Sequence, residues 1–372
     1  MRNNITDHGD FNSVTNKLSE NLEQARDYMK KTKPKIYKKL MSFLEKQRKD
    51  IYPRVSLLDW GYGLECNFSC EHCGTGSLGG HNLGNQTFSK RMPMDVVRRV
   101  ADEADELGFF TMSFIGGEPL VWRELDDLIK TVDSKRFYIT ILTNGWHLSE
   151  ERAGHLADVG VNKIGISIDS GIPGEHDSFR QKPGAFERAV KAVHNAMNAG
   201  LRIHISTTVT HQNLRSEGVK KLLVLSNELD VSIDLQCATV AGQWQGNYDV
   251  LLDDEDANYI LELRKEYPLI RRDLFPTPGG KGGCPALTGS VFLTSSGEVV
   301  PCLFIHISLG NVYKDSLKTI LERGASVAEL RKDTTKCLAG EDMEFIDKYL
   351  SRTFGASNLP LSFEDGFKKR SV

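Results

Sequence analysis

The chain has 372 residues, of which 26% are charged and 40% hydrophobic, and its formal net charge is −3. These values are ordinary for a globular protein and argue against a surface that mainly binds nucleic acid. No apolar run is long enough to span a membrane, and residues 1–7 lack the apolar core of a signal peptide. We therefore expect a cytoplasmic protein with two globular units, in which the seven cysteines indicate metal binding more than disulfides.

The first segment, residues 1–54, is polar and has a helical pattern. Apolar side chains recur at helical spacing, for example at Ile36, Leu40 and Phe43 after Pro34. This spacing predicts a pair of amphipathic helices. We expect the pair to pack against the outside of the following domain, because no strand-rich segment accompanies it to form a peptide-binding module.

The first chemical motif comes next, where Cys66, Cys70 and Cys73 are separated by three residues and then by two. Cysteine thiolates are the usual ligands of iron–sulfur clusters, and a loop this short brings three of them onto one cluster. Because a four-iron cluster needs four ligands, one iron stays open to another molecule. The spacing does not match the Cys and His pairs of a zinc knuckle, and a disulfide framework is typical of small secreted domains.

With His72 directly before its last cysteine, this motif resembles the signature of the radical S-adenosylmethionine (SAM) enzymes. The resemblance implies that the open iron binds the amino and carboxylate groups of SAM and that His72 lies near the adenine. It also implies reductive cleavage of SAM to methionine and a 5′-deoxyadenosyl radical. The fold that it implies is a partial (β/α)6 barrel.

Residues 55–250 alternate between strand and helix patterns, which predicts a parallel sheet with helices outside. The predicted strands cover residues 55–58, 110–115, 138–142, 163–168, 202–209 and 232–236. The helices predicted between them cover residues 93–107, 149–159, 185–199 and 216–229.

The last three predicted strands have one polar and one apolar face. Aliphatic residues alternate with polar residues or glycine, which are Gly165, Ser167, Asp169, His204, Ser206, Thr208, Ser232, Asp234 and Gln236. Parallel strands that are covered on both faces are apolar throughout, so one face here must contact something polar. We interpret it as the lumen of a curved, incomplete barrel that holds a polar cofactor and a polar substrate.

Several strand ends carry motifs to which the resemblance assigns SAM contacts. Residues 116–119 read Gly-Gly-Glu-Pro, in which glycines permit close backbone approach and the acidic side chain can bind an ammonium group. Residues 143–145 read Thr-Asn-Gly, a turn former. The SAM-binding residues that the resemblance implies are His72, Gly116, Gly117, Glu118, Pro119, Asn144, Ser167, Asp169 and Arg180. For Arg180, an ion pair with Glu175 or Asp177 is the alternative.

The composition changes after residue 250. Residues 253–267 have a helical pattern, and residues 276–284 form a glycine-rich connector without the strand and Gly-Lys-Ser/Thr ending of a phosphate loop. We expect five segments: an N-terminal helical extension (1–54), the partial barrel (55–250), a linker helix (251–275), an auxiliary-cluster domain (276–345) and a C-terminal tail (346–372).

The C-terminal domain carries three further cysteines, Cys284, Cys302 and Cys337. Residues 290–301 have the pattern of a hairpin, which brings its two ends together. Cys284, Gly297 and Cys302 resemble the opening of the SPASM domain of many radical SAM enzymes, and the lack of a denser cysteine run resembles its shortened form, called twitch. The resemblance implies a small α+β domain, made of the hairpin and a helix, that binds one auxiliary 4Fe-4S cluster with an unassigned fourth ligand. Three scattered buried cysteines are the alternative.

Cys237 follows the last predicted barrel strand. A thiol at this position can return a hydrogen atom to a substrate radical, as in some radical SAM epimerases, or ligate the auxiliary cluster. Because Cys237 shares its side of the strand with Ile233 and Leu235, we expect instead a core residue that faces the helices.

Together these motifs predict a radical SAM enzyme with two 4Fe-4S clusters and SAM as cofactors. The first hypothesis is hydrogen abstraction from a small polar metabolite of sugar, cyclitol or nucleotide type, which is then oxidised or rearranged with the help of the auxiliary cluster. An electron donor such as flavodoxin or ferredoxin is the implied partner. The alternatives are a maturase of a ribosomal peptide, a thiol-dependent epimerase and a non-enzymatic cluster carrier.

Overall fold

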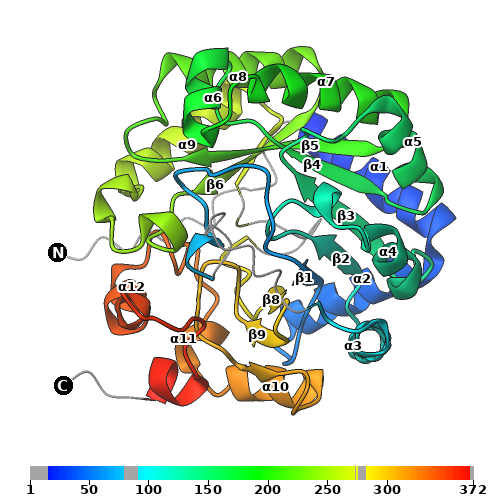
Figure 1. The fold of residues 1–372 in the computed structure, drawn as a ribbon, viewed down its shortest axis with the longest axis vertical. Helices are drawn as coiled ribbons and strands as arrows, with labels where there is room; N and C mark the ends of the chain where they lie inside the picture. Colours follow the sequence, from blue (N-terminus) through cyan, green and yellow to red (C-terminus); the bar gives the residue numbers. More distant parts are fainter. Residues whose placement is uncertain (1–15, 79–90, 273, 275–281, 369–372) are drawn as a thin grey trace.

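The computed structural model describes residues 16–78, 91–272, 274 and 282–368. Its strands form one ten-stranded sheet in the order β10-β9-β8-β1-β2-β3-β4-β5-β6-β7. In Figure 1 the strands β1 to β6 form an arc around the centre of the molecule, with helices outside the arc. The strands are β1 (Leu57–Gly61), β2 (Thr111–Phe114), β3 (Tyr138–Thr143), β4 (Lys163–Ser167), β5 (Arg202–Val209), β6 (Ser232–Cys237), β7 (Ile270–Arg272), β8 (Ser290–Thr294), β9 (Glu298–Val300) and β10 (Gly310–Asn311).

Strands β1 to β7 pair in parallel, and for β1 to β6 this is what the alternating sequence pattern predicts. The helices of the outer layer are α3 (Met94–Leu107), α4 (Leu125–Val132), α5 (Glu150–Asp158), α6 (Pro173–Arg180), α7 (Ala185–Asn198), α8 (Glu217–Glu228) and α9 (Asp254–Glu266). Serine caps define two of the starts. The hydroxyls of Ser149 and Ser216 accept from the amides of Arg152 and Val219, and so satisfy amides at the beginnings of α5 and α8.

Within residues 55–275, two α-helices and one strand were not indicated by the sequence pattern. They are the short helices α4 and α6 and the strand β7. Helix α9 forms over the predicted helical stretch and ends at Glu266, and after Pro268 the chain returns to the sheet and pairs with β6. Proline cannot continue the helical hydrogen bonds, which explains why the segment predicted as a linker helix also contains a strand.

The two faces of the sheet differ as the alternating residues predict. On β4, Ile164 and Ile166 are fully buried in the main apolar core. Ser167 of β4, Ser206 of β5 and Gln236 of β6 instead line an internal cavity. The polar lumen that the sequence predicts is therefore present.

Helices α1 (Asn16–Thr32) and α2 (Pro34–Arg48) form the predicted helical pair. Three apolar side chains of α2 are buried in one cluster with Phe110, the residue before β2: Ile36, Leu40 and Phe43. The pair thus packs against the barrel at the amino-terminal ends of its strands. Figure 1 draws both helices in blue behind the strands.

The predicted hairpin forms as β8 and β9, and it joins the sheet of the barrel. Strand β8 pairs in parallel with β1 along Leu57–Gly61, so backbone hydrogen bonds connect the C-terminal segment to the barrel. Gly297 in the hairpin turn has a φ of +86°, a conformation that favours glycine. Three helices follow: α10 (Leu317–Gly324), α11 (Ala328–Arg331) and α12 (Met343–Lys348). Residues 276–281 of the predicted connector lie outside the described part of the chain.

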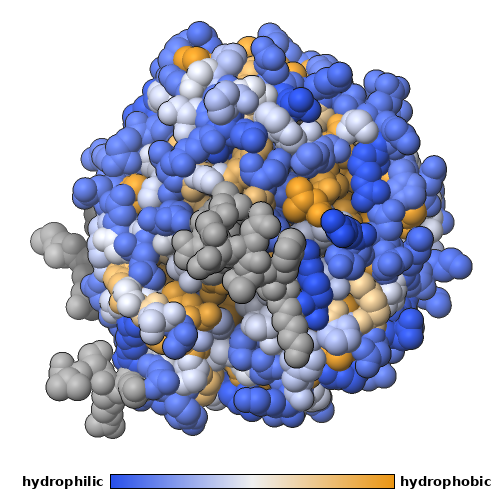
Figure 2. Space-filling model, in the orientation of Figure 1, coloured by the Kyte–Doolittle hydropathy of each residue, from blue (hydrophilic) through white to orange (hydrophobic). Residues whose placement is uncertain are grey.

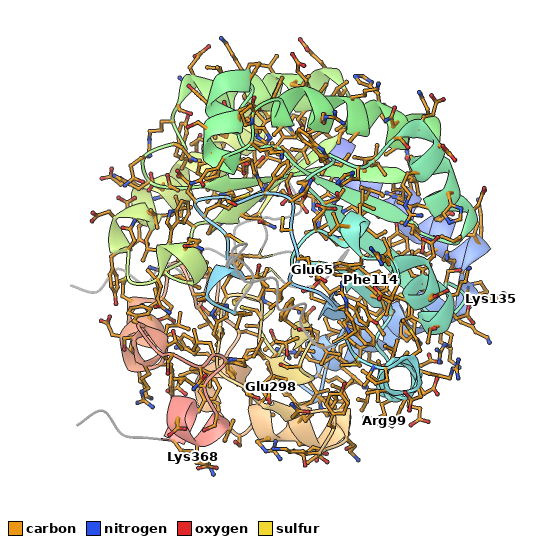
Figure 3. All side chains as sticks on the ribbon, in the orientation of Figure 1. Glu65, Arg99, Phe114, Lys135, Glu298 and Lys368 are labelled. Atoms are coloured by element: carbon orange, nitrogen blue, oxygen red, sulfur yellow. The ribbon has the colours of Figure 1, made fainter. Side chains whose placement is uncertain are left out.

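The exterior is mainly polar. The face shown in Figure 2 is mostly hydrophilic, with apolar residues in separate small groups. In Figure 3, Lys135 and Lys368 lie at the periphery, whereas Glu65 lies near the centre. Across the described ranges, no helix has the length and apolar character needed to cross a membrane.

Candidate active site

The lumen of the barrel contains a cavity of about 720 Å³. Both predicted cysteine groups line it: Cys66, Cys70, Cys73, Cys284, Cys302 and Cys337. Most of the predicted SAM contacts line it as well: His72, Gly116, Gly117, Glu118, Asn144, Ser167 and Arg180. Pro119 and Asp169 are buried but do not contribute to the lining. Residues from most of the sequence thus meet around one space.

The first cysteine group lies in the loop after β1, and each of its sulfur atoms has a polar contact. The Phe68 amide donates to Cys66 Sγ at 3.4 Å, and Thr75 Oγ1 lies 3.3 Å from Cys73 Sγ. Arg180 Nη1 lies 3.9 Å from Cys70 Sγ. Burial raises the pKa of the Cys66 and Cys70 thiols. Amide, hydroxyl and guanidinium groups beside the sulfurs are the surroundings that cluster-bound thiolates require, so these residues fit a cluster.

Two close backbone approaches fix this loop. A Cβ atom on Gly117 would lie 2.1 Å from Glu65 O, and one on Gly242 would lie 2.0 Å from Cys73 O. The Gln243 amide donates to the same Cys73 carbonyl at 3.0 Å. Glycine is needed at both positions because a larger residue would push the cysteine loop out of place.

Glu118 connects the Gly-Gly-Glu-Pro loop to the end of β3. Its buried carboxylate accepts from Thr143 Oγ1 at 2.6 Å, from the Asn144 amide at 2.8 Å and from the Leu120 amide at 3.0 Å. Burial raises the pKa of Glu118, and these hydrogen bonds oppose the rise. Asn144 Nδ2 in turn donates to Asn67 Oδ1 in the cysteine loop at 2.8 Å. The carboxylate therefore organises three loops and keeps room for one more donor among its lone pairs.

His72 lies in an aromatic group that the sequence motifs did not indicate. Its ring stacks on Phe179 with centroids 4.3 Å apart and an interplanar angle of 13°. Trp244 lies 5.8 Å away in a tilted orientation. For Trp244, the only sequence signal is the loop at residues 239–246, which has glycines near both ends. Phe179 lies on α6, a helix that the sequence pattern did not predict.

Arg180 pairs with Asp169 rather than with either acidic residue of its own loop. Its Nε donates to Asp169 Oδ2 at 2.6 Å. Burial raises the pKa of Asp169, but Arg180 and neighbouring histidines lower it by more, so the net shift is downward. Glu175 accepts from Ser170, and Asp177 accepts from amides at the start of α7. The alternative pairing for Arg180 is therefore wrong.

The second cysteine group lies across the cavity. A hydrogen bond with the Cys284 thiol and burial both raise the pKa of Cys337. The Cys284 amide donates to Thr334 O at 2.9 Å, and the Cys337 amide donates to Glu341 Oε2 at 2.8 Å. Cys302 lines the same cavity. The Cys284 and Cys337 thiols are in contact and Cys302 lines the same cavity, so these three residues fit a second cluster.

Cys237 is buried in the core, as the alternation predicts, and it also touches the edge of the cavity. Arg272 Nη2 donates to its sulfur at 3.1 Å and to Glu341 Oε1 at 2.6 Å. Burial raises the pKa of the Cys237 thiol, and Arg272 opposes the rise. A role as hydrogen donor or as cluster ligand stays a prediction.

Comparisons with known proteins agree with this arrangement. The sequence matches the Radical SAM superfamily over residues 62–223 and the iron–sulfur cluster-binding domain SPASM over residues 284–339. It is 25% identical over 317 residues to an AdoMet-dependent heme synthase of Nitratidesulfovibrio vulgaris, a match that covers 77% of this chain and 84% of the relative. A GTP 3′,8-cyclase of Desulforamulus reducens is also 25% identical, over 77% of this chain and 90% of the relative.

A solved structure shows the same fold. Streptococcus suis SuiB bound to the precursor peptide SuiA superposes with a TM-score of 0.57 at 16% identity, over 77% of this chain and 68% of SuiB. The chain belongs to the radical SAM superfamily and carries a SPASM-type domain. It is an enzyme, and its cofactors are SAM and 4Fe-4S clusters.

Proposed function

We propose that this enzyme acts on a small polar metabolite that binds inside the barrel lumen. The observation that supports the proposal most strongly is one cavity that both cysteine groups line and that carries polar side chains along β2 to β6. The lining includes hydroxyl, amide and charged side chains on β2 to β6, among them Ser113, Thr140, Ser206 and Gln236. Such groups bind a molecule that offers hydrogen bonds in return.

In this proposal the first cysteine group, Cys66, Cys70 and Cys73, holds the cluster that binds SAM. With its SAM bound, this cluster supplies a 5′-deoxyadenosyl radical that removes a hydrogen atom from the substrate. The chain's own residues orient the cofactor. Glu118 accepts from the SAM ammonium group, Arg180 attracts the carboxylate, and His72 lies against the adenine, while Gly116, Gly117, Asn144 and Ser167 contact the remainder.

The second group, Cys284, Cys302 and Cys337, holds the auxiliary cluster in this proposal. Because these thiols share the cavity with the first group, a bound substrate has both groups as neighbours. A cluster held by these three residues would supply electron transfer from the substrate, or a site that ligates it. A small reducing protein such as flavodoxin or ferredoxin supplies the electron for SAM cleavage.

The lining favours a metabolite of sugar, cyclitol or nucleotide type over a large apolar ring. Ser113, Thr140, Ser206 and His204 are nearly fully buried, so a hydrocarbon surface against them would leave their polar atoms without partners.

The experiment is an anaerobic assay of the reconstituted enzyme with SAM, a reductant and deuterated sugars, cyclitols and nucleotides. A substrate transfers deuterium to 5′-deoxyadenosine, which mass spectrometry detects. The proposal is wrong if 5′-deoxyadenosine forms but takes deuterium only from peptides or from tetrapyrroles.

A further inference from the structure

The end of the lumen that faces α1 carries a group of polar and charged residues to which no role has been assigned. Backbone register places Ser113, Thr140 and Lys163 side by side on β2, β3 and β4, and all three line the cavity. Tyr28 and Met29 of α1 line the cavity as well. We use the term lumen floor for five of the lining residues: Ser113, Lys163, His204, Asp234 and Arg271.

Three polar atoms of the lumen floor are buried without a hydrogen-bond partner among the described residues. They are Ser113 Oγ, His204 Nδ1 and Asp234 Oδ1. Ser113 is only 2% exposed and His204 6%. A Cβ atom on Gly165 would lie 2.4 Å from the His204 ring, so this glycine makes room for the imidazole. Buried polar atoms are nearly always paired, and three unpaired ones around one cavity indicate that a ligand supplies the partners.

Within the lumen floor, Asp234 forms long ion pairs with Arg271 and His204. Arg271 Nε lies 3.5 Å from Asp234 Oδ1, and His204 Nε2 lies 3.7 Å from Asp234 Oδ2. Both distances are longer than a hydrogen bond.

Lys163 is the charged residue of the lumen floor whose side chain lacks an ion-pair partner in the described ranges. No hydrogen bond or ion pair joins its ammonium group to any residue in the described ranges. The charges that act on it are one carboxylate, Asp234, and two guanidinium groups, Arg271 and Arg202. Burial first, and then the two arginines, lower the pKa of Lys163 to about 8, whereas Asp234 opposes the shift. Two more carboxylates, Asp59 and Asp230, line the same cavity, but neither pairs with Lys163, so an incoming anion can bond to its ammonium group.

We propose that the lumen floor binds an anionic group of the substrate, a carboxylate or a phosphate, through Lys163 and Arg271. Ser113 and His204 then bond to neighbouring hydroxyl groups of the same molecule. This inference rests on the proposed function in one respect, which is that the lumen is the substrate site.

The dimensions of the barrel agree with this placement. Lys163 and Ser167 lie four residues apart on β4 and both line the cavity, which corresponds to about 13 Å along the strand. A metabolite anchored at Lys163 would extend toward Ser167 and the first cysteine group. Its reacting carbon would thereby be held at the cofactor end, while its anion fixes the orientation.

Anion binding to the reconstituted holoenzyme with SAM tests the inference. Inorganic phosphate is the probe in one series of equilibrium dialysis measurements and glycolate in the other, which distinguishes a phosphate site from a carboxylate site. We expect saturable binding of at least one probe. Lys163→Gln should weaken that binding at least tenfold, because it removes the ammonium group and keeps a polar side chain of similar length.

Two further variants separate recognition from a general loss of structure. Asp234→Asn removes the competing carboxylate, so it should strengthen anion binding several-fold, in the direction opposite to Lys163→Gln. Lys221→Gln on α8 is the matched control, since its side chain is 56% exposed, and it should bind the probe as the wild type does. If Lys163→Gln fails to fold, Arg271→Gln replaces it, with the same expected loss.

The inference is overturned if neither probe binds the wild type, if Lys163→Gln binds as tightly as Lys221→Gln, or if Asp234→Asn weakens binding. SAM cleavage without substrate is measured on the same samples. Wild-type enzyme that makes 5′-deoxyadenosine but binds no anion contradicts this inference alone. Enzyme that makes no 5′-deoxyadenosine contradicts the proposed function instead.

Discussion

The two ends of the lumen differ in how their charged side chains are paired. At the cofactor end, Glu118 accepts three hydrogen bonds and Asp169 pairs with Arg180, so the loops are fixed before any ligand binds. At the lumen floor, Lys163 and His204 Nδ1 have no hydrogen-bond partner in the described part of the chain. The loops with the predicted SAM contacts are therefore fixed by hydrogen bonds within the chain, whereas in our proposal the substrate supplies the partner of Lys163.

Removal of the first cysteine group should have the largest effect. We expect the Cys66→Ala/Cys70→Ala/Cys73→Ala variant to lose all 5′-deoxyadenosine formation and about four of roughly eight irons, because each group of three thiolates holds one four-iron cluster. Iron analysis and product quantification measure both. The matched control is Cys237→Ala, which should keep the wild-type iron content. A triple variant that still cleaves SAM contradicts the assignment.

Removal of thiols from the second cysteine group should separate SAM cleavage from product formation. We expect Cys284→Ala/Cys302→Ala to abolish product, while uncoupled SAM cleavage continues at the first group. The β8–β1 pairing holds this segment to the barrel, so a folded variant is expected. Circular dichroism, 5′-deoxyadenosine and product are measured together. Normal product from a folded variant would leave the auxiliary cluster without a role, and unfolding would make it structural.

A change at Glu118 should weaken the cofactor end in a graded way. Glu118→Gln removes the charge, and its amide group faces the donors Thr143 and Asn144. We expect the free energy of SAM binding to become less favourable by about 1–3 kcal/mol, the range for one charge-assisted hydrogen bond. Calorimetry with SAM measures it, with exposed Glu151→Gln on α5 as the control. Equal affinity in the two variants would mean that the loop at residues 116–119 is only a turn.

A change at the lumen floor should show its effect in the free energy of unfolding, which should rise when Lys163 is replaced by an uncharged residue. Folding lowers the pKa of Lys163 from 10.5 to about 8. Between pH 8 and about 10 the unfolded chain therefore binds more protons than the folded protein. The charged Lys163 lowers the free energy of unfolding by its full amount below pH 8, and by less as the pH approaches 10. Lys163→Met should raise the free energy of unfolding at pH 7 by about 1–3 kcal/mol.

Urea unfolding at several pH values measures this difference, with Lys221→Met as the control. The advantage of Lys163→Met over the wild type should shrink as the pH rises from 8 to 10. An advantage that does not change with pH would show that Lys163 carries no buried charge.

Local patterns predicted the barrel well. The alternation of isoleucine with polar residues on β4 to β6 identified the lumen face, since a strand's two faces follow directly from residue parity. Cysteine spacing identified both groups that line the cavity. These features depend on neighbours in the sequence, so a single chain is enough to recognise them.

Contacts between distant segments were not predictable in the same way. Nothing near residue 290 indicates that β8 continues the barrel sheet beside β1, because pairing depends on where the whole chain returns. The ion pair between Arg180 and Asp169 likewise depends on α6, which ends at Arg180 and was not predicted from the sequence. Lys163 has the pattern of an ordinary polar residue at a strand start. Only the folded barrel shows that it lines the cavity and that no residue in the described ranges pairs with it.

The central claim is that charged groups are paired at the cofactor end, whereas Lys163 at the lumen floor takes its partner from the substrate. The most direct test uses an extract of cells grown on deuterated medium, separated by anion exchange. The enzyme is incubated with each fraction, SAM and reductant, and 5′-deoxyadenosine is analysed for deuterium. The account predicts that, with the wild type, small molecules retained by the anion exchanger transfer deuterium to 5′-deoxyadenosine. Lys163→Gln should need a much higher concentration of the same fraction to reach the same transfer. Deuterium transfer only from the unretained fraction, or equally to both proteins, would contradict it.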